Sequence, residues 1–280
     1  MKKQRHKAEK AYRNERFLAS PDARSLRILS EFIEPLSRFR RQHVSDTIVF
    51  YGSARIIPPD KAKGNYKALQ KKYLNKKQLS AADEDKLQAA RTLLEMSKYY
   101  QEAVELSRML TQWSKKFYHS DHFVVCSGGG PGIMEAANRG ARLAGGRSVG
   151  LNISLPFEQS ANPYIPDELN FEFHYFFMRK FWFAYLGKAF VMFPGGYGTF
   201  DELMEILTLL QTEKIRKKVT VVLYGSDYWR RVVNFPLMEE LHLISRKDLN
   251  LFSYADSPKE AFDILVDHLR RNYPTARMRP

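Results

Sequence analysis

Residues 194–202 read Pro-Gly-Gly-Tyr-Gly-Thr-Phe-Asp-Glu and lie between an apolar run at 189–193 and a helical run at 203–210. The first run predicts a buried strand and the second predicts a helix. Glycines let the backbone approach an anion closely, and the free amides and dipole at a helix start favour negative charge. The order of strand, glycine turn and helix therefore predicts a phosphate-binding loop followed by a carboxylate, Glu202.

A purely structural role for these residues is the alternative. Thr199 could cap the helix, and Glu202, three residues later, could complete a capping box. Three glycines within four residues, Gly195, Gly196 and Gly198, exceed what a cap requires. The sequence therefore favours phosphate binding, with the Thr199 hydroxyl as a further donor.

A second glycine-rich loop repeats this architecture. Residues 127–135 read Ser-Gly-Gly-Gly-Pro-Gly-Ile-Met-Glu, after a strand expected at 123–126 and before a helix expected from Ile133. A third turn, Gly-Ser-Ala-Arg at 52–55, follows a β-rich run at 47–51. Loops after parallel strands leave from the carboxyl edge, where such sheets bind ligands. The three turns are therefore expected to line one ligand-binding site.

Alternation of strands and helices continues along the chain. Further strands are expected at 148–153, 171–175 and 219–224, and their uniformly apolar character is typical of a parallel sheet covered on both faces. The predicted fold is thus α/β, a doubly wound parallel sheet with helices on both faces. Other helices are expected at 25–40, within 81–118 as one or two long helices, from Met178, Thr199 and Tyr228, and at 258–271.

The predicted organisation is one domain with appendages. Residues 1–46 form a basic arm and an amphipathic helix, residues 47–272 form the nucleotide-binding domain with a Lys-rich insert at 58–80, and residues 273–280 form a tail. The helix at 25–40 places Leu26, Leu29, Ile33, Leu36 and Phe39 at helical spacing, so these side chains are expected to dock on the core.

The net charge of +14 is mostly peripheral. Residues 1–16 hold seven Lys or Arg against two Glu, and residues 61–77 hold seven Lys and no acid. We interpret both runs as solvated, flexible surface, since like charges repel and extend the chain. Contact with nucleic acid is the disfavoured alternative.

Cysteine and histidine suggest no metal chemistry. Cys126 is the single cysteine and lies in an apolar run, so neither a disulfide framework nor a cysteine-based metal site is predicted. His119, His122 and His174 lack partners at ligand spacing and are assigned to packing. A reducing cytoplasm is the expected compartment, because no apolar leader segment or membrane span is found.

Two nucleotide-binding fingerprints fail. Counting from Gly128 and Gly130, the last position of Gly-x-Gly-x-x-Gly is Ile133, and no acidic residue stands near Asn152. A P-loop is excluded because the nearest match reads Gly-Lys-Ala at 187–189. Sites for NAD and ATP are therefore disfavoured.

Two cations, Arg179 and Lys180, stand at the start of a predicted helix, where they oppose its dipole. A nearby anion would compensate, either a bound phosphate or Glu202, and arginine suits bidentate pairing. Two solvated surface charges are the alternative.

Together the turn at 52–55, residues 127–141, the Met-Arg-Lys at 178–180 and the loop at 194–202 resemble the LOG family, over roughly residues 47–242. Its members are cytokinin-activating phosphoribohydrolases, often mislabelled lysine decarboxylases. The resemblance implies a Rossmann-like fold, a dimer or larger homo-oligomer, and hydrolysis of a nucleoside 5′-monophosphate to free base and ribose 5-phosphate, without a metal or organic cofactor.

The resemblance also implies roles for residues. Arg179 and Glu202 would be catalytic, the loop from Gly195 to Thr199 would hold the phosphate, and Ser53 with the second loop would line the nucleotide site. The candidate binding residues are Gly195, Gly196, Gly198, Thr199, Ser127, Gly128, Gly129, Ser53, Arg55, Met134, Glu135, Asn138 and Lys180.

Two departures bear on the substrate. Plant-type members have a His-Glu pair between Met and Arg, whereas Met178 directly precedes Arg179, and Glu135 stands where those members tend to have glycine. General purine or pyrimidine nucleotide hydrolysis therefore stands beside hormone activation, and a non-catalytic nucleotide sensor is the alternative function. Lysine decarboxylation is disfavoured because no lysine has a recognisable pyridoxal phosphate setting.

Overall fold

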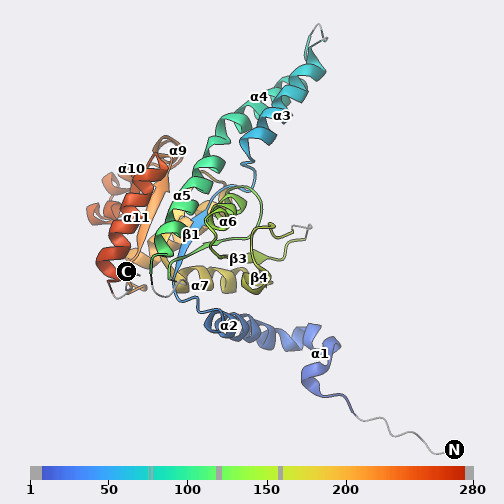
Figure 1. Ribbon diagram of the computed structural model, residues 1–280, viewed down its shortest axis with the longest axis vertical. Coiled ribbons are helices and arrows are strands. Elements are labelled where there is room, and N and C mark those ends of the chain that lie inside the picture. The colour runs from blue at the N-terminus through green and yellow to red at the C-terminus, as the bar shows by residue number, and fades with distance from the viewer. Residues whose placement is uncertain (1–7, 75, 77, 118–121, 157–159, 275–280) are drawn as a thin grey trace, which may run out of the picture.

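The computed structural model describes residues 8–74, 76, 78–117, 122–156 and 160–274 (Figure 1). Its centre is a seven-stranded, all-parallel sheet with the spatial order β4-β3-β2-β1-β5-β6-β7. The order reverses between β1 and β5, which makes this the topological switch point of the sheet. The strands are β1 (Thr47–Tyr51), β2 (Val124–Ser127), β3 (Ser148–Ile153), β4 (Asn170–Phe173), β5 (Gly187–Met192), β6 (Thr220–Tyr224) and β7 (Ser253–Ala255).

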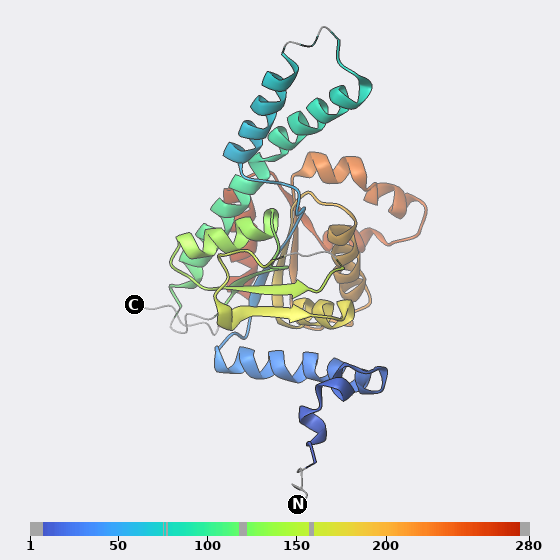
Figure 2. The same ribbon diagram turned by 90° about the vertical axis from the view of Figure 1, so that its right-hand side faces the viewer.

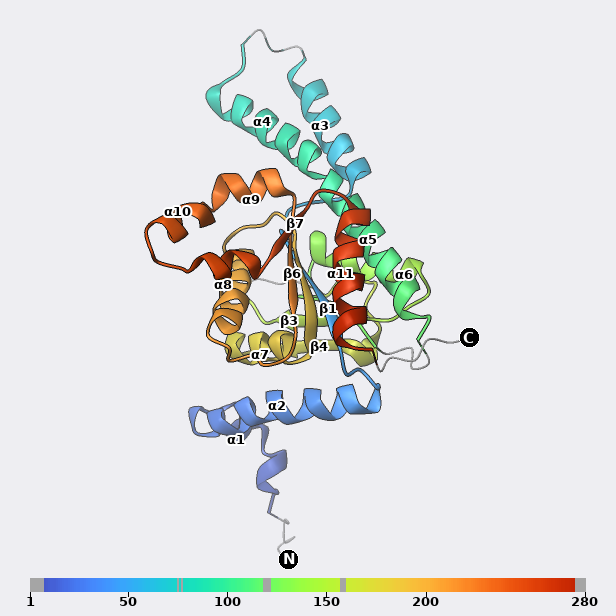
Figure 3. The same ribbon diagram turned by 90° about the vertical axis from the view of Figure 1, so that its left-hand side faces the viewer.

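Helices cover both faces of the sheet, as predicted (Figure 3). The α-helices are α1 (Glu15–Ala19), α2 (Arg24–Arg41), α3 (Pro59–Tyr73), α4 (Ala81–Met96), α5 (Lys98–Ser114), α6 (Ile133–Leu143), α7 (Phe176–Leu186), α8 (Tyr197–Gln211), α9 (Ser226–Val232), α10 (Phe235–Glu240) and α11 (Pro258–Asn272). Short 3-10 helices are η1 (Ala11–Arg13), η2 (Pro21–Ala23), η3 (Asp167–Leu169) and η4 (Arg246–Asn250).

Two hydrophobic cores follow from this layering. Along β1, Ile48 and Phe50 pack with α5, α6 and α11, while Val49 and Tyr51 pack on the opposite face with α7 and α8. Alternate residues of one strand therefore enter different cores. Because both faces are buried, the strand has no polar side, which is why the uniformly apolar runs correctly predicted strands.

The N-terminal helix docks with a different face from the one expected. In α2, Phe39 is buried and Ile28 and Leu36 pack against the core, whereas Leu26, Leu29 and Ile33 remain about half exposed. The prediction that all five apolar residues dock on the core was therefore wrong for these three. Helical spacing locates an apolar face but does not show how much of it a neighbour covers.

The Lys-rich insert is also more ordered than expected. Its first part forms α3, which with α4 makes a hairpin that projects away from the sheet (Figures 1 and 2). The lysines of α3 are exposed, as predicted, but they lie on a helix and not on an extended run. No helix in the described part of the chain has the length and apolar character required to cross a membrane.

Candidate functional site

A cavity of about 890 Å³ opens at the carboxyl edge of the sheet, at the switch point between β1 and β5. All three predicted turns contribute to its wall: residues 52–55 after β1, Gly128 after β2, and residues 195–200 after β5. Crevices at this position bind ligands in open α/β sheets. The expectation that the turns meet at one site therefore agrees with the structure.

The loop after β5 leaves the start of α8 open to the cavity. Gly196 is the N-cap residue without any side-chain cap, and Thr199 is the third helical residue, so the capping box between Thr199 and Glu202 does not form. Amides in the first turn of a helix have no intrahelical acceptor. The amides of Tyr197 and Gly198 hold this position, at the positive end of the helix dipole.

The glycines of this loop have separate roles. A Cβ on Gly195 would lie 2.1 Å from Thr199 Oγ1, whereas a Cβ on Gly196 or Gly198 would meet no atom within 4 Å. Gly195 thus permits packing within the loop, and the other two keep open the space in front of the helix. Ser53 N donates to Pro194 O at 3.0 Å, and the Tyr228 hydroxyl donates to Gly195 O, so the loop is held from both sides.

Glu202 lines the cavity one turn after Gly198, and only 5% of its surface is exposed. Its Oε2 accepts a hydrogen bond from the Tyr51 hydroxyl at 3.3 Å, while its buried Oε1 has no hydrogen-bond partner among the described residues. Burial raises the pKa of Glu202 to about 7, against the opposing effect of the Arg179 and Lys180 charges. A carboxyl with such a pKa exchanges its proton near neutral pH.

Arg179, on α7, faces this carboxylate. Its Nη2 lies 3.8 Å from Glu202 Oε1, and its buried Nε has no hydrogen-bond partner in the described part of the chain. The guanidinium carbon lies 5.3 Å from the Phe176 ring centre and 5.8 Å from that of Phe183. Since buried polar groups are normally satisfied, two unsatisfied groups beside one cavity indicate a place for a polar ligand.

Lys180 points elsewhere. It pairs with Asp201 Oδ1 at 2.7 Å and with Glu205 Oε2 at 2.9 Å, both on α8. A cation at the start of α7 was expected to have an anion nearby, and Asp201 and Glu205 are the anions that pair with Lys180. Lys180 therefore ties α7 to α8 and does not line the cavity.

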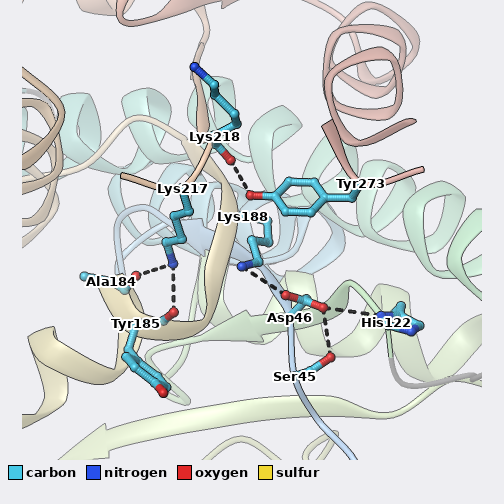
Figure 4. Close-up of polar contacts among 9 residues, drawn as sticks. All are labelled: Ser45, Asp46, His122, Ala184, Tyr185, Lys188, Lys217, Lys218 and Tyr273. Atoms are coloured by element: carbon cyan, nitrogen blue, oxygen red, sulfur yellow. Dashed lines mark hydrogen bonds and ion pairs between the residues drawn. The ribbon is translucent and has the colours of Figure 1, made fainter. Parts of the chain in front are cut away.

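Both ends of α7 are held in place. At its start the Glu31 carboxylate of α2 accepts from His174 N at 2.8 Å and from Tyr175 N at 3.2 Å, which also offsets the cations there. At its end Lys217 Nζ donates to Ala184 O at 2.6 Å and to Tyr185 O at 2.8 Å (Figure 4). Burial, with the nearby Lys188 charge, lowers the pKa of Lys217 to about 7. These caps fix the helix that presents Arg179.

Two of the histidines considered in the sequence, His122 and His174, contact neighbouring protein side chains. His122 Nδ1 lies 3.3 Å from Asp46 Oδ2, and Asp46 also pairs with Lys188 (Figure 4). The ring of His174 lies edge-on to that of Tyr175, with centroids 4.7 Å apart. His119 falls outside the described residues.

The predicted binding residues divide into two groups. Some support the second loop from behind and do not line the cavity: Ser127 Oγ donates to Asn138 Oδ1 at 2.7 Å, and Gly129 N donates to Ser127 Oγ. Glu135 instead accepts from the Tyr100 hydroxyl at 2.6 Å, on the side of α5. The residues that do line the cavity are Ser53, Arg55, Gly128, Met134, Arg179, Gly195, Gly196, Gly198, Thr199 and Glu202.

Sequence reasoning missed most of the aromatic and apolar wall. Tyr51 ends β1 beneath the site, Phe176 precedes the Arg-Lys pair, and Tyr197, within the glycine loop, is 97% exposed at the rim. The position of Tyr51 at the end of a predicted strand was an available signal. The remaining wall residues that were not predicted include Asn152, Ile153, Leu155, Phe183, Phe200 and Tyr228.

Residues 134–265 match the model of a protein family described as "Possible lysine decarboxylase", which is the LOG-like family of the motifs above. Over these residues, which make up just under half of the chain, the protein is similar to the LOG-like family. The LOG-like match runs from the start of α6 into α11 and includes Arg179 and the loop at 194–202, but not β1 or the α3–α4 hairpin. No curated protein matches the chain.

Several solved structures are similar to the chain. One is TM1055, a structural genomics target, with 20% identity, a TM-score of 0.46, and coverage of 79% of this chain and 99% of that one. Another is a molybdenum cofactor binding protein from the phototrophic bacterium Rippkaea orientalis, with 19% identity, a TM-score of 0.42, and coverage of 60% and 86%. A third is the Moco carrier protein from Chlamydomonas reinhardtii, with 18% identity, a TM-score of 0.42, and coverage of 62% and 89%.

Proposed function

We propose that the chain hydrolyses the N-glycosidic bond of a nucleoside 5′-monophosphate, releasing the free base and ribose 5-phosphate. The observation that carries this proposal is the position of Glu202. A buried carboxylate, one oxygen of which has no hydrogen-bond partner among the described residues, faces the cavity one helical turn beyond amides suited to a phosphate. In a 5′-nucleotide the phosphate and the anomeric carbon lie at opposite sides of one ribose, so the two groups can engage the same substrate.

The chemistry follows from the charge that develops on the sugar. As the bond from C1′ to the base nitrogen breaks, its electron pair leaves with the base and positive charge builds on the ribose, which the Glu202 carboxylate stabilises. Water then bonds to C1′ and gives a proton to Glu202, while the departing base takes a proton from solvent. Glu202 then returns its proton to solvent, which restores the carboxylate. Arg179, fixed between its aromatic neighbours, positions the carboxylate and the substrate.

Release of ribose 5-phosphate tests the proposal directly. The purified protein is incubated with AMP, GMP, CMP and UMP, and with the nucleosides that lack the phosphate. We expect ribose 5-phosphate from at least one nucleotide and no comparable release of base from the nucleosides. Nucleotide binding by calorimetry without any product would instead favour the second candidate, a non-catalytic nucleotide sensor.

Lysine decarboxylation is not proposed. A pyridoxal phosphate enzyme requires a lysine that can form a Schiff base in its site. Among the described residues none of those lining the cavity is a lysine, and the nearby Lys180 is engaged with Asp201 and Glu205.

Discrimination between bases is expected to be modest. An apolar part of the wall is formed by Met134, Ile153, Leu155 and Phe176. The side-chain amide of Asn152 already donates hydrogen bonds to Asn170 Oδ1 and Phe171 O. Apolar contacts discriminate by roughly 10–200-fold, whereas dedicated hydrogen bonds reach about 10⁴-fold. The kcat/KM values of the preferred and the poorest of the four nucleotides should therefore differ by no more than about 100-fold. Strict use of one base would contradict this view of the wall.

The pH dependence of activity should report the ionisation of Glu202. Because burial raises the pKa of this carboxyl to about 7, the ionised form required for catalysis accumulates as the pH rises through 7. We expect kcat/KM to rise about tenfold per pH unit below 7 and to level off above about 8. The second ionisation of the phosphate lies lower, near pH 6. Activity that falls between pH 6 and 8 would show that Glu202 acts as an acid.

A further inference from the structure

The hairpin of α3 and α4 stands away from the body of the protein and joins it through α5 (Figures 1 and 2). Its interior is thin: Ala62 and Tyr73 of α3 and Ala90 of α4 are its buried side chains among the described residues. A helical hairpin that buries so little apolar surface adds little to the stability of the domain. The exposed side chains of the hairpin are therefore not accounted for by the stability of the fold.

Cations dominate the α3 side of this hairpin. Asp60 is the one acidic residue within α3. At the tip, Lys76 pairs with Asp83 at 2.6 Å, so that cation is neutralised. The exposed lysines in the described part of this segment are Lys61, Lys63, Lys67, Lys71, Lys72 and Lys76.

Three of these lysines form a stripe. Lys63, Lys67 and Lys71 follow one another at intervals of four residues, which places them about 6 Å apart along one line of the helix. The stripe is turned away from the buried flank of α3 that carries Ala62 and Tyr73. None of the three forms an ion pair with a residue that the structure describes.

Like charges at this spacing destabilise a helix. The repulsion is removed when an anion with repeated charges lies along the stripe. A polymer with a phosphate at each unit has this property, and it would release its own counterions on binding.

We propose that the stripe of Lys63, Lys67 and Lys71 binds the phosphate backbone of single-stranded nucleic acid. A membrane surface fits less well, because interfacial helices insert an apolar face and the apolar side chains Ala62 and Tyr73 of α3 are instead buried. The helix begins four residues after Arg55, which lines the cavity, so the hairpin that carries the stripe follows directly on one wall of the site in the chain. This binding does not depend on the hydrolase activity.

Fluorescence anisotropy with labelled RNA and DNA single strands of about 12 nucleotides tests the proposal across a salt series. The variant Lys63→Gln/Lys67→Gln/Lys71→Gln is compared with the full-length wild-type chain. The matched control, Lys116→Gln/Lys214→Gln/Lys247→Gln, removes the same charge from exposed lysines outside the hairpin. Circular dichroism and thermal melts verify that both variants fold.

The stripe variant should bind at least tenfold more weakly at about 100 mM salt, and its plot of log affinity against log salt should be shallower by about 2, from three lost contacts at roughly 0.7 each. The control should stay within about twofold of wild type. Equal losses in the two variants would overturn the proposal, as would absence of strand binding by wild type at low salt. Binding to phosphatidylserine vesicles without binding to either strand would assign the stripe to membranes instead.

Discussion

Replacing Glu202 by Gln is expected to lower kcat/KM for a nucleoside 5′-monophosphate by about 10³-fold or more. Gln keeps the shape of the side chain but carries no negative charge for the ribose and cannot take a proton from water. The Tyr51 hydroxyl can still donate to the remaining carbonyl oxygen, so the packing around position 202 is retained. Steady-state assays of ribose 5-phosphate release measure the change, and a variant with more than a tenth of wild-type activity would remove Glu202 from the mechanism.

The stability of the same variant serves as its control. Because burial raises the pKa of Glu202 from an ordinary value to about 7, the folded wild type binds more protons than the unfolded chain between about pH 4.5 and pH 7. The contribution of Glu202 to the free energy of unfolding of wild type therefore falls as the pH rises from about 4.5 to 7. At pH 8 the free energy of unfolding of the Gln variant should exceed that of wild type by up to about 3 kcal/mol. This difference should disappear near pH 4.5. Inactivity combined with higher stability cannot be ascribed to unfolding.

Replacing Gly198 by Ala is expected to lower kcat/KM by roughly 100-fold, mainly through weaker binding of the nucleotide. The added methyl group meets no protein atom within 4 Å but projects at the open start of α8, where the phosphate is expected. Alanine also favours the helix over glycine, so stability should not fall. Calorimetric titration with AMP and with adenosine shows whether the loss belongs to the phosphate.

Substitutions at two further glycines serve as controls for this experiment. Gly64→Ala, in α3, also adds a methyl group that meets nothing within 4 Å, and it should leave activity unchanged. Gly195→Ala would place its Cβ 2.1 Å from Thr199 Oγ1 and should instead destabilise the fold. If Gly198→Ala bound AMP as wild type does, the loop would not be the phosphate site.

Much of the architecture could be predicted because strand and helix leave different patterns. The apolar run before Pro194 and the glycines after it located β5, the turn and α8 to within a few residues. Parallel strands then implied that the turns meet at one edge. The strand β7 was not predicted, since three residues bury too little to leave a pattern, and α3 was missed because its lysines outweighed its helical spacing.

The direction of individual side chains was harder to predict. Glu135 and Asn138 stand on the same helix as Met134, yet Met134 lines the cavity while Glu135 reaches Tyr100 and Asn138 holds the second loop. Their separation depends on the rotation of α6 about its axis, which the packing of α5 against it sets. Lys180 likewise turns to α8 because Asp201 and Glu205 offer two carboxylates within 3 Å.

The most direct test is a crystal structure of the Glu202→Gln variant with AMP. The phosphate oxygens should accept hydrogen bonds from the amides at the start of α8, and C1′ of the ribose should lie against the side chain at position 202. A nucleotide bound with its phosphate away from the loop, or with its ribose remote from position 202, would contradict the proposed mechanism.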